Sequence, residues 1–285
     1  GGSSGRLRRE LGVLPPGDIL DGISARAGGE SIITRLFQYR FREGSDLNGH
    51  SFGNLFIAAM AGVTGNFERA VLESSRVLAV QGCILPSTLS NVTLCADLRD
   101  EALAGEDAKA LHVKGESQIP EARLPIERVY LEPHKVPACW DAVAALQEAD
   151  LILLGPGSLY TSILPNLLVG GITRSLKASS VLKVYICNIA TQLGETEGYS
   201  VADHVRALEE HIGPGGFDFV LANDNLELGF PPEWTIGPVS LDDALPRGYK
   251  LATADLIDQE MPWRHDPAKL ADATMKLYRA HHKKR

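Results

Sequence analysis

The residues best placed to do chemistry lie in the stretch GPGSLYTSILPN, which follows a short apolar run. Gly155 and Gly157 allow the backbone to approach a ligand closely, and Ser158 offers a hydroxyl where a helix is expected to begin. Exposed backbone N–H groups at a helix start suit a phosphate or carboxylate. A tight strand-to-helix turn with ordinary capping explains the same residues equally well. The stretch matches neither G-x-G-x-x-G nor G-x-x-x-x-G-K-[ST], so it establishes neither dinucleotide nor P-loop binding.

A second polar stretch, ATQLGETEGYSVADH, follows the next apolar run, LKVYICNI. Asn188, Thr191 and Tyr199 lie in a loop over residues 188–199, and a loop of this length is more often functional than a plain connection. The alternative is a surface loop whose Ser200 caps the next helix.

A third apolar run, FDFVLANDN, ends in polar residues that include Asn223. In an open parallel sheet, ligands bind beyond the carboxyl ends of the strands. We therefore expect the loop of Gly155, Gly157 and Ser158, the loop that begins at Asn188, and Asn223 to converge on one site.

Two further motifs are less specific. In GHSFGNL, His50 and Asn54 lie four residues apart and could share a helix face, although Ser51 as a helix cap with Asn54 as a packing residue is an equal alternative. In WRHD, Arg264 could grip a phosphate or carboxylate with two hydrogen bonds, with Asp266 capping the next helix, and a surface ion pair is at least as good an explanation. No metal-ligand motif and no Ser-His-Asp order with a nucleophile elbow is found, and no catalytic residue is assigned.

Composition narrows the class of protein. The chain has 285 residues, with 44% hydrophobic and 22% charged residues, as in ordinary globular proteins. Its net charge of -8 predicts no general affinity for nucleic acid. The 4 cysteines form no C-x-x-C pair, which argues against a disulfide framework or a structural zinc site. No apolar run reaches the ~20 residues of a membrane span, so we expect a cytoplasmic protein.

The order of patterns along the chain predicts an α/β fold. Residues 1–80 have helical spacing of apolar residues, and residues 81–135 contain short β-rich runs that indicate a small insertion. From about residue 138, buried strands alternate with helices at 161–177 and 200–211. This alternation predicts a Rossmann-like parallel sheet with helices on both faces, within a single domain over 1–285.

Taken together, several blocks resemble the gluconeogenesis-factor family, the YvcK-like proteins within the CofD-like superfamily of 2-phospho-L-lactate transferases. The blocks are GGSSGRLRRELGVLPPGDI, LFQYRF, GHSFGNLF, LAVQGCILPST, VKGESQI, GPGSLYTSILPNLLV, TQLGETEGYSVADHV and RHD. The opening GGSSG could by itself be a cloning linker, and the resemblance identifies it as a native loop. The family normally places a first strand and a glycine-rich loop before it, so the resemblance implies that this chain lacks both and that one wall of its site is missing.

The resemblance implies a UDP-sugar ligand such as UDP-N-acetylglucosamine, and a regulatory role in cell shape and peptidoglycan synthesis during gluconeogenic growth. It leaves catalysis uncertain. The residues that it places in the ligand site are Gly1, Gly2, Ser3, Ser4, Asn54, Gly157, Ser158, Thr191, Tyr199 and Arg264. The chain departs from the family where Ile19 is followed by Leu20, and where Pro267 replaces a common threonine.

Three hypotheses remain open. The first is the UDP-sugar-binding regulator, with a nucleotide sugar as its small-molecule partner and an unidentified cell-wall partner downstream. The second is a phospholactyl transferase that uses a nucleotide-activated donor, a deazaflavin acceptor and Mg²⁺. The third is a nicotinamide-dependent oxidoreductase, although no acidic residue follows a G-x-G-x-x-G loop at the ~20-residue spacing that holds the ribose. The oligomeric state is open, with a homodimer as a candidate.

Overall fold

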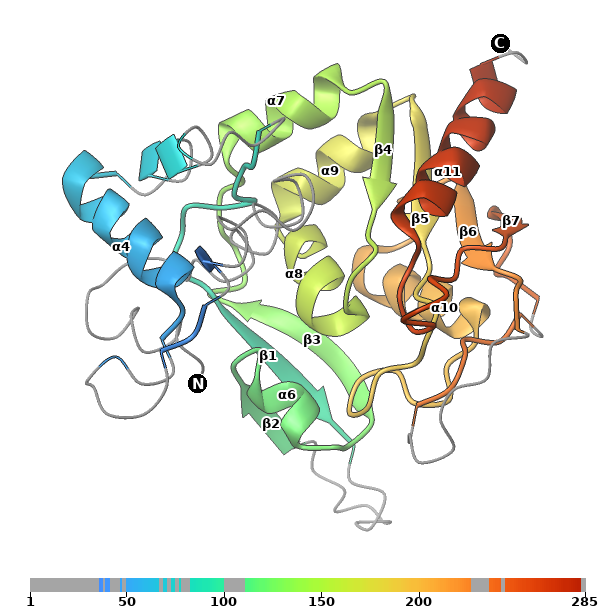
Figure 1. The fold of residues 1–285 in the computed structure, drawn as a ribbon, viewed down its shortest axis with the longest axis horizontal. Coiled ribbons are helices and arrows are strands. Elements are labelled where there is room, and N and C mark those ends of the chain that lie inside the picture. Colours follow the sequence, from blue (N-terminus) through green and yellow to red (C-terminus); the bar gives the residue numbers. More distant parts are fainter. Residues whose placement is uncertain are drawn as a thin grey trace. The chain divides into compact units, whose positions relative to one another are not determined.

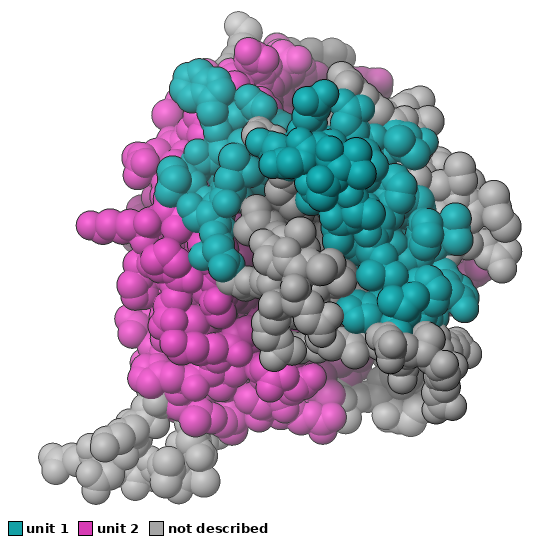
Figure 2. Space-filling view, turned by 90° about the vertical axis from the view of Figure 1, so that its left-hand side faces the viewer, with its two compact units in different colours: residues 1–91, 137–142 teal, residues 92–136, 143–285 magenta. Residues whose placement is uncertain are grey.

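The computed structural model describes residues 36–37, 39–41, 47, 50–66, 69–70, 73–74, 77, 83–99, 111–226, 236–241 and 244–282. The chain divides into two compact units, residues 1–91 with 137–142 and residues 92–136 with 143–285, which Figure 2 colours separately. The expectation of a single domain over 1–285 with an insertion at 81–135 stays a prediction. Gly1, Gly2, Ser3 and Ser4 lie outside the described residues.

The first unit contains the helix α4 (Phe52–Thr64), which the apolar spacing of SFGNLFIAAMAGV predicts. Ser51 caps it, because its side chain accepts a hydrogen bond from the backbone N–H of Asn54 at 3.2 Å. Gly65, in the left-handed region at φ 67°, ends it. The ring of Phe37 contacts the rings of Phe52 and Phe56 edge-on, with centroids 5.4 and 5.0 Å apart. The capping role of Ser51 is therefore confirmed, and a ligand contact of Asn54 stays a prediction.

The second unit is built on a parallel sheet in the order β4-β5-β6-β7 (Figure 1). Its strands are β4 (Leu151–Leu154), β5 (Leu182–Ile186), β6 (Phe219–Asn223) and β7 (Lys250–Ala254). The predicted α/β fold is confirmed. The sequence patterns predict the first three strands but not β7. Lys250, Leu251 and Thr253 of β7 are exposed, so this strand lacks the apolar run that marks a buried one.

Helices cover both faces of this sheet. Helices that follow strands β4 to β7 along the chain include α8 (Leu164–Leu167), α9 (Gly170–Ala178), α10 (Val201–Ile212) and α11 (Pro267–His282). Ala273 and its neighbours on α11 pack against Leu182, Val184 and Leu221 (Figure 1). Since successive side chains of a strand point to opposite faces, and all five residues of β5 are buried, the other face is covered as well.

An antiparallel sheet in the order β2-β1-β3 belongs to the same unit. Its strands are β1 (Thr93–Leu98), β2 (Leu111–Lys114) and β3 (Ile126–Glu132), the short helix α6 (Gln118–Glu121) joins β2 to β3, and α7 (Trp140–Glu148) follows. These strands confirm the β-rich character predicted for this part of the chain. On one face, the buried carboxylate of Asp97 binds His112 and Arg128, each at 2.5 Å.

His211 ties this antiparallel sheet to α10. Its Nε2 accepts a hydrogen bond from the backbone N–H of Val129 at 2.9 Å, so its Nδ1 carries the proton and donates to the carbonyl of Ala207. A protonated imidazole has no acceptor left for Val129. Burial lowers the pKa of His211, which keeps the ring neutral.

Gly155, directly after β4, is predicted to accept a side chain only at a cost in stability. Its φ is 86°, and an added Cβ would lie 3.1 Å from both the Ile186 carbonyl oxygen and Ile163 Cδ1. Gly155→Ala should therefore combine a backbone cost of about 1–2 kcal/mol with an overpacking cost of about 1–3 kcal/mol. Urea unfolding measures the sum. Gly215→Ala is the matched control, because φ is 84° there and nothing lies within 4 Å. Equal losses in the two variants would contradict the close approach.

The neutral His211 predicts a loss of stability in acid. A group whose pKa is lowered on folding stabilises the protein above its unfolded value, here the ordinary 6.5, and the stabilisation is lost as pH falls below it. The free energy of unfolding should therefore drop between about pH 7.5 and about pH 5, and less so in His211→Gln, which accepts a hydrogen bond without titrating. His134→Gln, at an exposed position, is the control for replacing a histidine away from this contact. An undiminished drop in His211→Gln would rule out this source.

Candidate functional site

The carboxyl ends of β4 and β5 lie side by side, and a hydrogen bond joins the loops that follow them. Gln192 Nε2 donates to Ser158 Oγ at 2.8 Å, and Asn188 Nδ2 donates to Gln192 Oε1 at 3.4 Å. These strands are parallel neighbours with Leu154 opposite Tyr185, so their loops leave the sheet at the same edge. The predicted convergence of the first two polar stretches is therefore seen in the structure.

Ser158 is followed by a wide turn of helix, the π-helix η1 (Leu159–Ile163), which runs into α8. The backbone N–H groups of Ser162 and Ile163 both donate to the carbonyl of Ser158, at 3.0 and 2.9 Å. Pro165 has no N–H to close the ordinary helical hydrogen bond to Thr161, and it stands at the first turn of α8. Single π-turns within helices are frequent at functional sites.

The carboxylate of Glu195, from the loop after β5, binds the start of this π-helix. This carboxylate accepts hydrogen bonds from the backbone N–H of Tyr160 at 3.2 Å and from the hydroxyl of Thr161 at 2.7 Å. The residue is 9% exposed, and burial raises the pKa of its carboxyl while these two hydrogen bonds oppose that rise. The sequence motif predicts that this helix start binds an external anion. In the structure, the Tyr160 N–H and the Thr161 hydroxyl bind the Glu195 carboxylate instead.

Further backbone donors lie directly before the residues that bind Glu195. Within the part of the chain that the structure describes, the N–H groups of Gly157, Ser158 and Leu159 have no hydrogen-bond acceptor. They precede the Tyr160 N–H directly in sequence. An anionic group bound there would therefore lie next to the Glu195 carboxylate.

The other predicted residues have clear structural partners. Tyr199 and Tyr160 share a hydrogen bond between their hydroxyls at 2.8 Å. Thr191 Oγ1 accepts from the N–H of Gly237 at 3.1 Å. Asn223 Oδ1 accepts from the N–H of Leu256 at 3.1 Å. Each interaction fixes a loop beside the carboxyl edge of the sheet.

Two residues of the WRHD motif make hydrogen bonds beside the sheet. His265 Nε2 donates to the carbonyl of Cys187, at the end of β5, at 3.2 Å, and burial lowers the pKa of His265. Asp266 caps α11, since its Oδ1 accepts from the N–H groups of Ala268 and Lys269 at 2.8 and 2.9 Å. Arg264 is exposed. Asn54 lies in the first unit, in the first turn of α4.

Sequence reasoning did not select Gln192, Glu195 or His265 as site residues. Gln192 and Glu195 stand in a loop with several polar residues, and nothing local distinguishes them from Thr196 or Glu197. His265 stands next to the more conspicuous Arg264. Only the partners of these side chains in space identify them.

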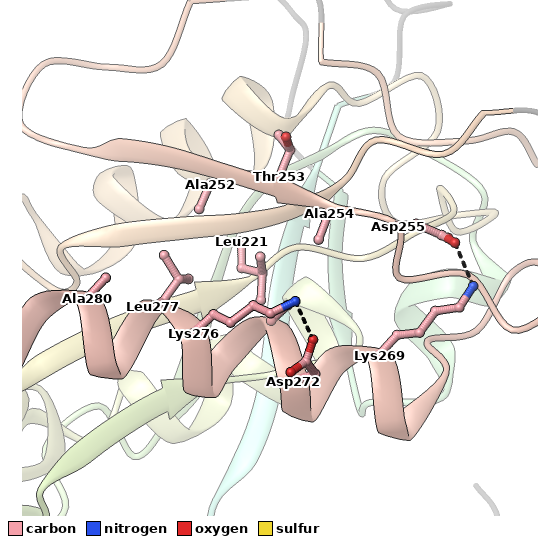
Figure 3. Close-up of a pocket in the computed structure, with 11 residues that line it drawn as sticks. Leu221, Ala252, Thr253, Ala254, Asp255, Lys269, Asp272, Lys276, Leu277 and Ala280 are labelled. Carbon is pink, nitrogen blue, oxygen red and sulfur yellow. Dashed lines mark hydrogen bonds and ion pairs between the residues drawn. The ribbon is translucent and has the colours of Figure 1, made fainter.

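Cavities lined by described residues of this unit differ in their surroundings. One of about 430 Å³ borders Gly155, Gly157 and Ser162 and is otherwise mainly apolar. Another, of about 510 Å³, lies between α11 and the strands β6 and β7 (Figure 3). Its charged residues pair with each other, Lys269 with Asp255 at 2.7 Å and Lys276 with Asp272 at 2.6 Å, over a floor of small apolar side chains. We therefore take the carboxyl edge, and not the second cavity, as the candidate site.

The described residues contain neither a metal-binding cluster nor a helix that could span a membrane. No group of three or more His, Cys, Asp or Glu side chains is arranged to hold a metal ion there. None of the described helices is both long enough and apolar enough to cross a membrane.

Fold and site together define a Rossmann-like α/β protein with a polar site at the carboxyl edge of its parallel sheet. Its family follows from comparison with known proteins. The sequence profile described as 2-phospho-L-lactate transferase CofD matches residues 1–276, and the chain belongs to this CofD family.

Relatives with known names are similar over most of this chain. A putative gluconeogenesis factor of Nostoc sp. is 46% identical over 100% of this chain and 62% of its own length. Gluconeogenesis factors of Halalkalibacterium halodurans and Bacillus subtilis are 39% and 44% identical, over 96% and 90% of this chain and 85% and 74% of their own lengths. A solved structure from Bacillus halodurans, of the UPF0052 family, superposes with a TM-score of 0.82 at 38% identity, over 96% of this chain and 87% of that one. The chain thus spans less than two thirds of the Nostoc relative.

The Thr161 hydroxyl is predicted to stabilise the charged form of Glu195. Thr161→Val leaves a buried carboxylate with one donor fewer, which should cost about 1–3 kcal/mol at neutral pH. The raised pKa of Glu195 means that its stabilisation is present below the ordinary 4.5 and is lost as pH rises through the folded value. Losing the hydroxyl raises this pKa further, so the cost should be larger at about pH 8 than at about pH 5.

The control for this measurement is Thr161→Ser, which keeps the hydroxyl. Chemical unfolding at the two pH values gives the difference between the variants. A pH-independent difference would show that the hydroxyl does not act through the Glu195 charge.

Proposed function

We propose that this chain is a nucleotide-sugar-binding regulator, with UDP-N-acetylglucosamine as its ligand, required for cell shape and cell-wall synthesis during gluconeogenic growth. Membership of the CofD family and similarity to proteins named gluconeogenesis factors support the proposal. Binding without turnover and a cytoplasmic location are part of it.

The observation that carries the proposal is the hydrogen-bonded pair of loops at the carboxyl edge. The N–H groups of Gly157 and Ser158 are suited to phosphate oxygens. The amides of Gln192 and Asn188, with the hydroxyl of Ser158, add side-chain donors and acceptors of the kind that bind sugar hydroxyls. Open parallel sheets bind ligands at this edge.

A second candidate is the phospholactyl transferase, which the description of the matching family favours. It would use a nucleotide-activated donor, a deazaflavin acceptor and Mg²⁺. A diphosphate suits the same backbone donors in both cases, so the loops do not distinguish the two. Turnover does.

A thermal-shift titration separates the candidates. UDP-N-acetylglucosamine should raise the Tm when present well above its dissociation constant, since a ligand at ~100 times that value adds about 2.7 kcal/mol. UDP-glucose, GDP and NAD are the comparison ligands. A response to GDP and a deazaflavin with Mg²⁺, accompanied by product, would favour the transferase, and a response to NAD alone would favour an oxidoreductase.

Arg264 is predicted to bind the diphosphate. Arg264→Ala should weaken binding of UDP-N-acetylglucosamine by more than about tenfold, and Arg264→Lys should restore only part of it, because an ammonium cannot make the paired hydrogen bonds of a guanidinium. Calorimetric titration measures the affinity. Arg279→Ala, an exposed arginine of α11, is the control. Unchanged affinity in Arg264→Ala would remove this residue from the site.

A further inference from the structure

The short helix α6, which begins in the VKGESQI motif, makes a contact through the following Pro120 that the proposed function does not use. We propose that α6 supports the loop of Gln192 to Thr196 and thereby positions Glu195 at the start of η1. The role of α6 as a positioning element can be tested without any ligand. Its consequence for affinity rests on the proposed function.

The contact is between two backbones. Gly194 has a φ of 75°, and a Cβ added to it would lie 2.2 Å from the carbonyl oxygen and 2.9 Å from the carbonyl carbon of Pro120. Neither atom can turn away as the end of a flexible side chain would. The loop therefore lies directly on the last turn of α6, and only glycine fits at this position.

The helix α6 is itself held in place. Ile119 is 0% exposed and anchors it. Before it, the N–H of Gly115 donates to the carbonyl of Leu94 in β1 at 2.8 Å. After it, Arg123 adopts a φ of 51°, the one positive value recorded for a non-glycine residue in the described segments, and its N–H bonds the Pro120 carbonyl at 3.3 Å. Strained backbone of this kind persists where its surroundings determine it.

The contact leads directly to the site. Gly194 precedes Glu195, and the N–H groups of Glu195 and Thr196 both donate to the carbonyl of Gln192, at 3.1 and 2.9 Å. Gln192 through Glu195 thus forms one tight turn. A displacement at Gly194 moves both the amide that bonds Ser158 and the carboxylate that bonds Tyr160. Since close-packed segments transmit such displacements, α6 determines where these groups lie.

The test compares Gly194→Ala with Gly198→Ala in the ligand-free protein. Gly198 lies in the same loop with a φ of 72° and nothing within 4 Å, so its alanine variant meets the backbone strain without the collision. Hydrogen exchange of the Tyr160 amide, followed by NMR, reports the bond to Glu195. We expect Gly194→Ala to accelerate this exchange by about tenfold or more, because the local opening becomes easier, and Gly198→Ala to leave it nearly unchanged.

A second readout is the titration of the Glu195 carboxyl by NMR. Its raised pKa should move toward the ordinary value in Gly194→Ala, because a displaced carboxyl is better solvated, and stay raised in Gly198→Ala. Uniform destabilisation does not produce this difference. If Gly194→Ala does not fold, Ile119→Val, a milder change to the α6 anchor, should shift both readouts in the same direction.

Equal exchange and equal titration in the two glycine variants would overturn the proposal. Affinity for UDP-N-acetylglucosamine is measured separately on the same proteins. If the wild-type chain binds no UDP-sugar while Gly194→Ala still frees the Tyr160 amide, the positioning role stands and the proposed ligand fails.

Discussion

The buried carboxylate of Glu195 is the interaction on which the site depends. Moving a carboxylate out of water costs several kcal/mol unless donors compensate. Here the Tyr160 N–H and the Thr161 hydroxyl supply them. The same two bonds hold the start of η1 against the loop that follows β5. The Glu195 carboxylate therefore connects the segment after β4 with the loop after β5.

The parallel sheet makes this arrangement possible. With Leu154 beside Tyr185 and Ile186 beside Leu221, the chain leaves β4, β5 and β6 at one edge. Close backbone approaches then bring the loops together, at Gly155 over the end of β5 and at Gly194 on α6. A Cβ would be crowded at Gly155 and would collide with backbone at Gly194. Two glycines thus matter for the site although neither carries a functional group.

Backbone donors at this edge can bind an anionic ligand in an acidic chain, although the Glu195 carboxylate lies next to them. The net charge is -8, yet the donors at the edge are backbone N–H groups, which carry no titrating charge. Burial keeps His265 and His211 neutral and holds the pKa of the Glu195 carboxyl above its ordinary value. The donors offered to a ligand at this edge are therefore backbone dipoles. Backbone dipoles of this kind bind phosphates in many proteins.

Periodicity and residue type determined much of this protein from the sequence alone. Apolar runs between helical stretches predict the parallel sheet and its first three strands, and polar residues after those runs predict the edge where loops meet. The capping roles of Ser51, Ser200 and Asp266 also follow from residue type.

Tertiary structure decided the rest. The exposed strand β7 has no apolar run to mark it. Glu195, Gln192 and His265 acquire roles from partners distant in sequence, such as Tyr160, Ser158 and Cys187. Local sequence reports backbone preference and burial, because both act over a few residues. Which donor meets which acceptor depends on strand order and loop path, which only the folded chain establishes.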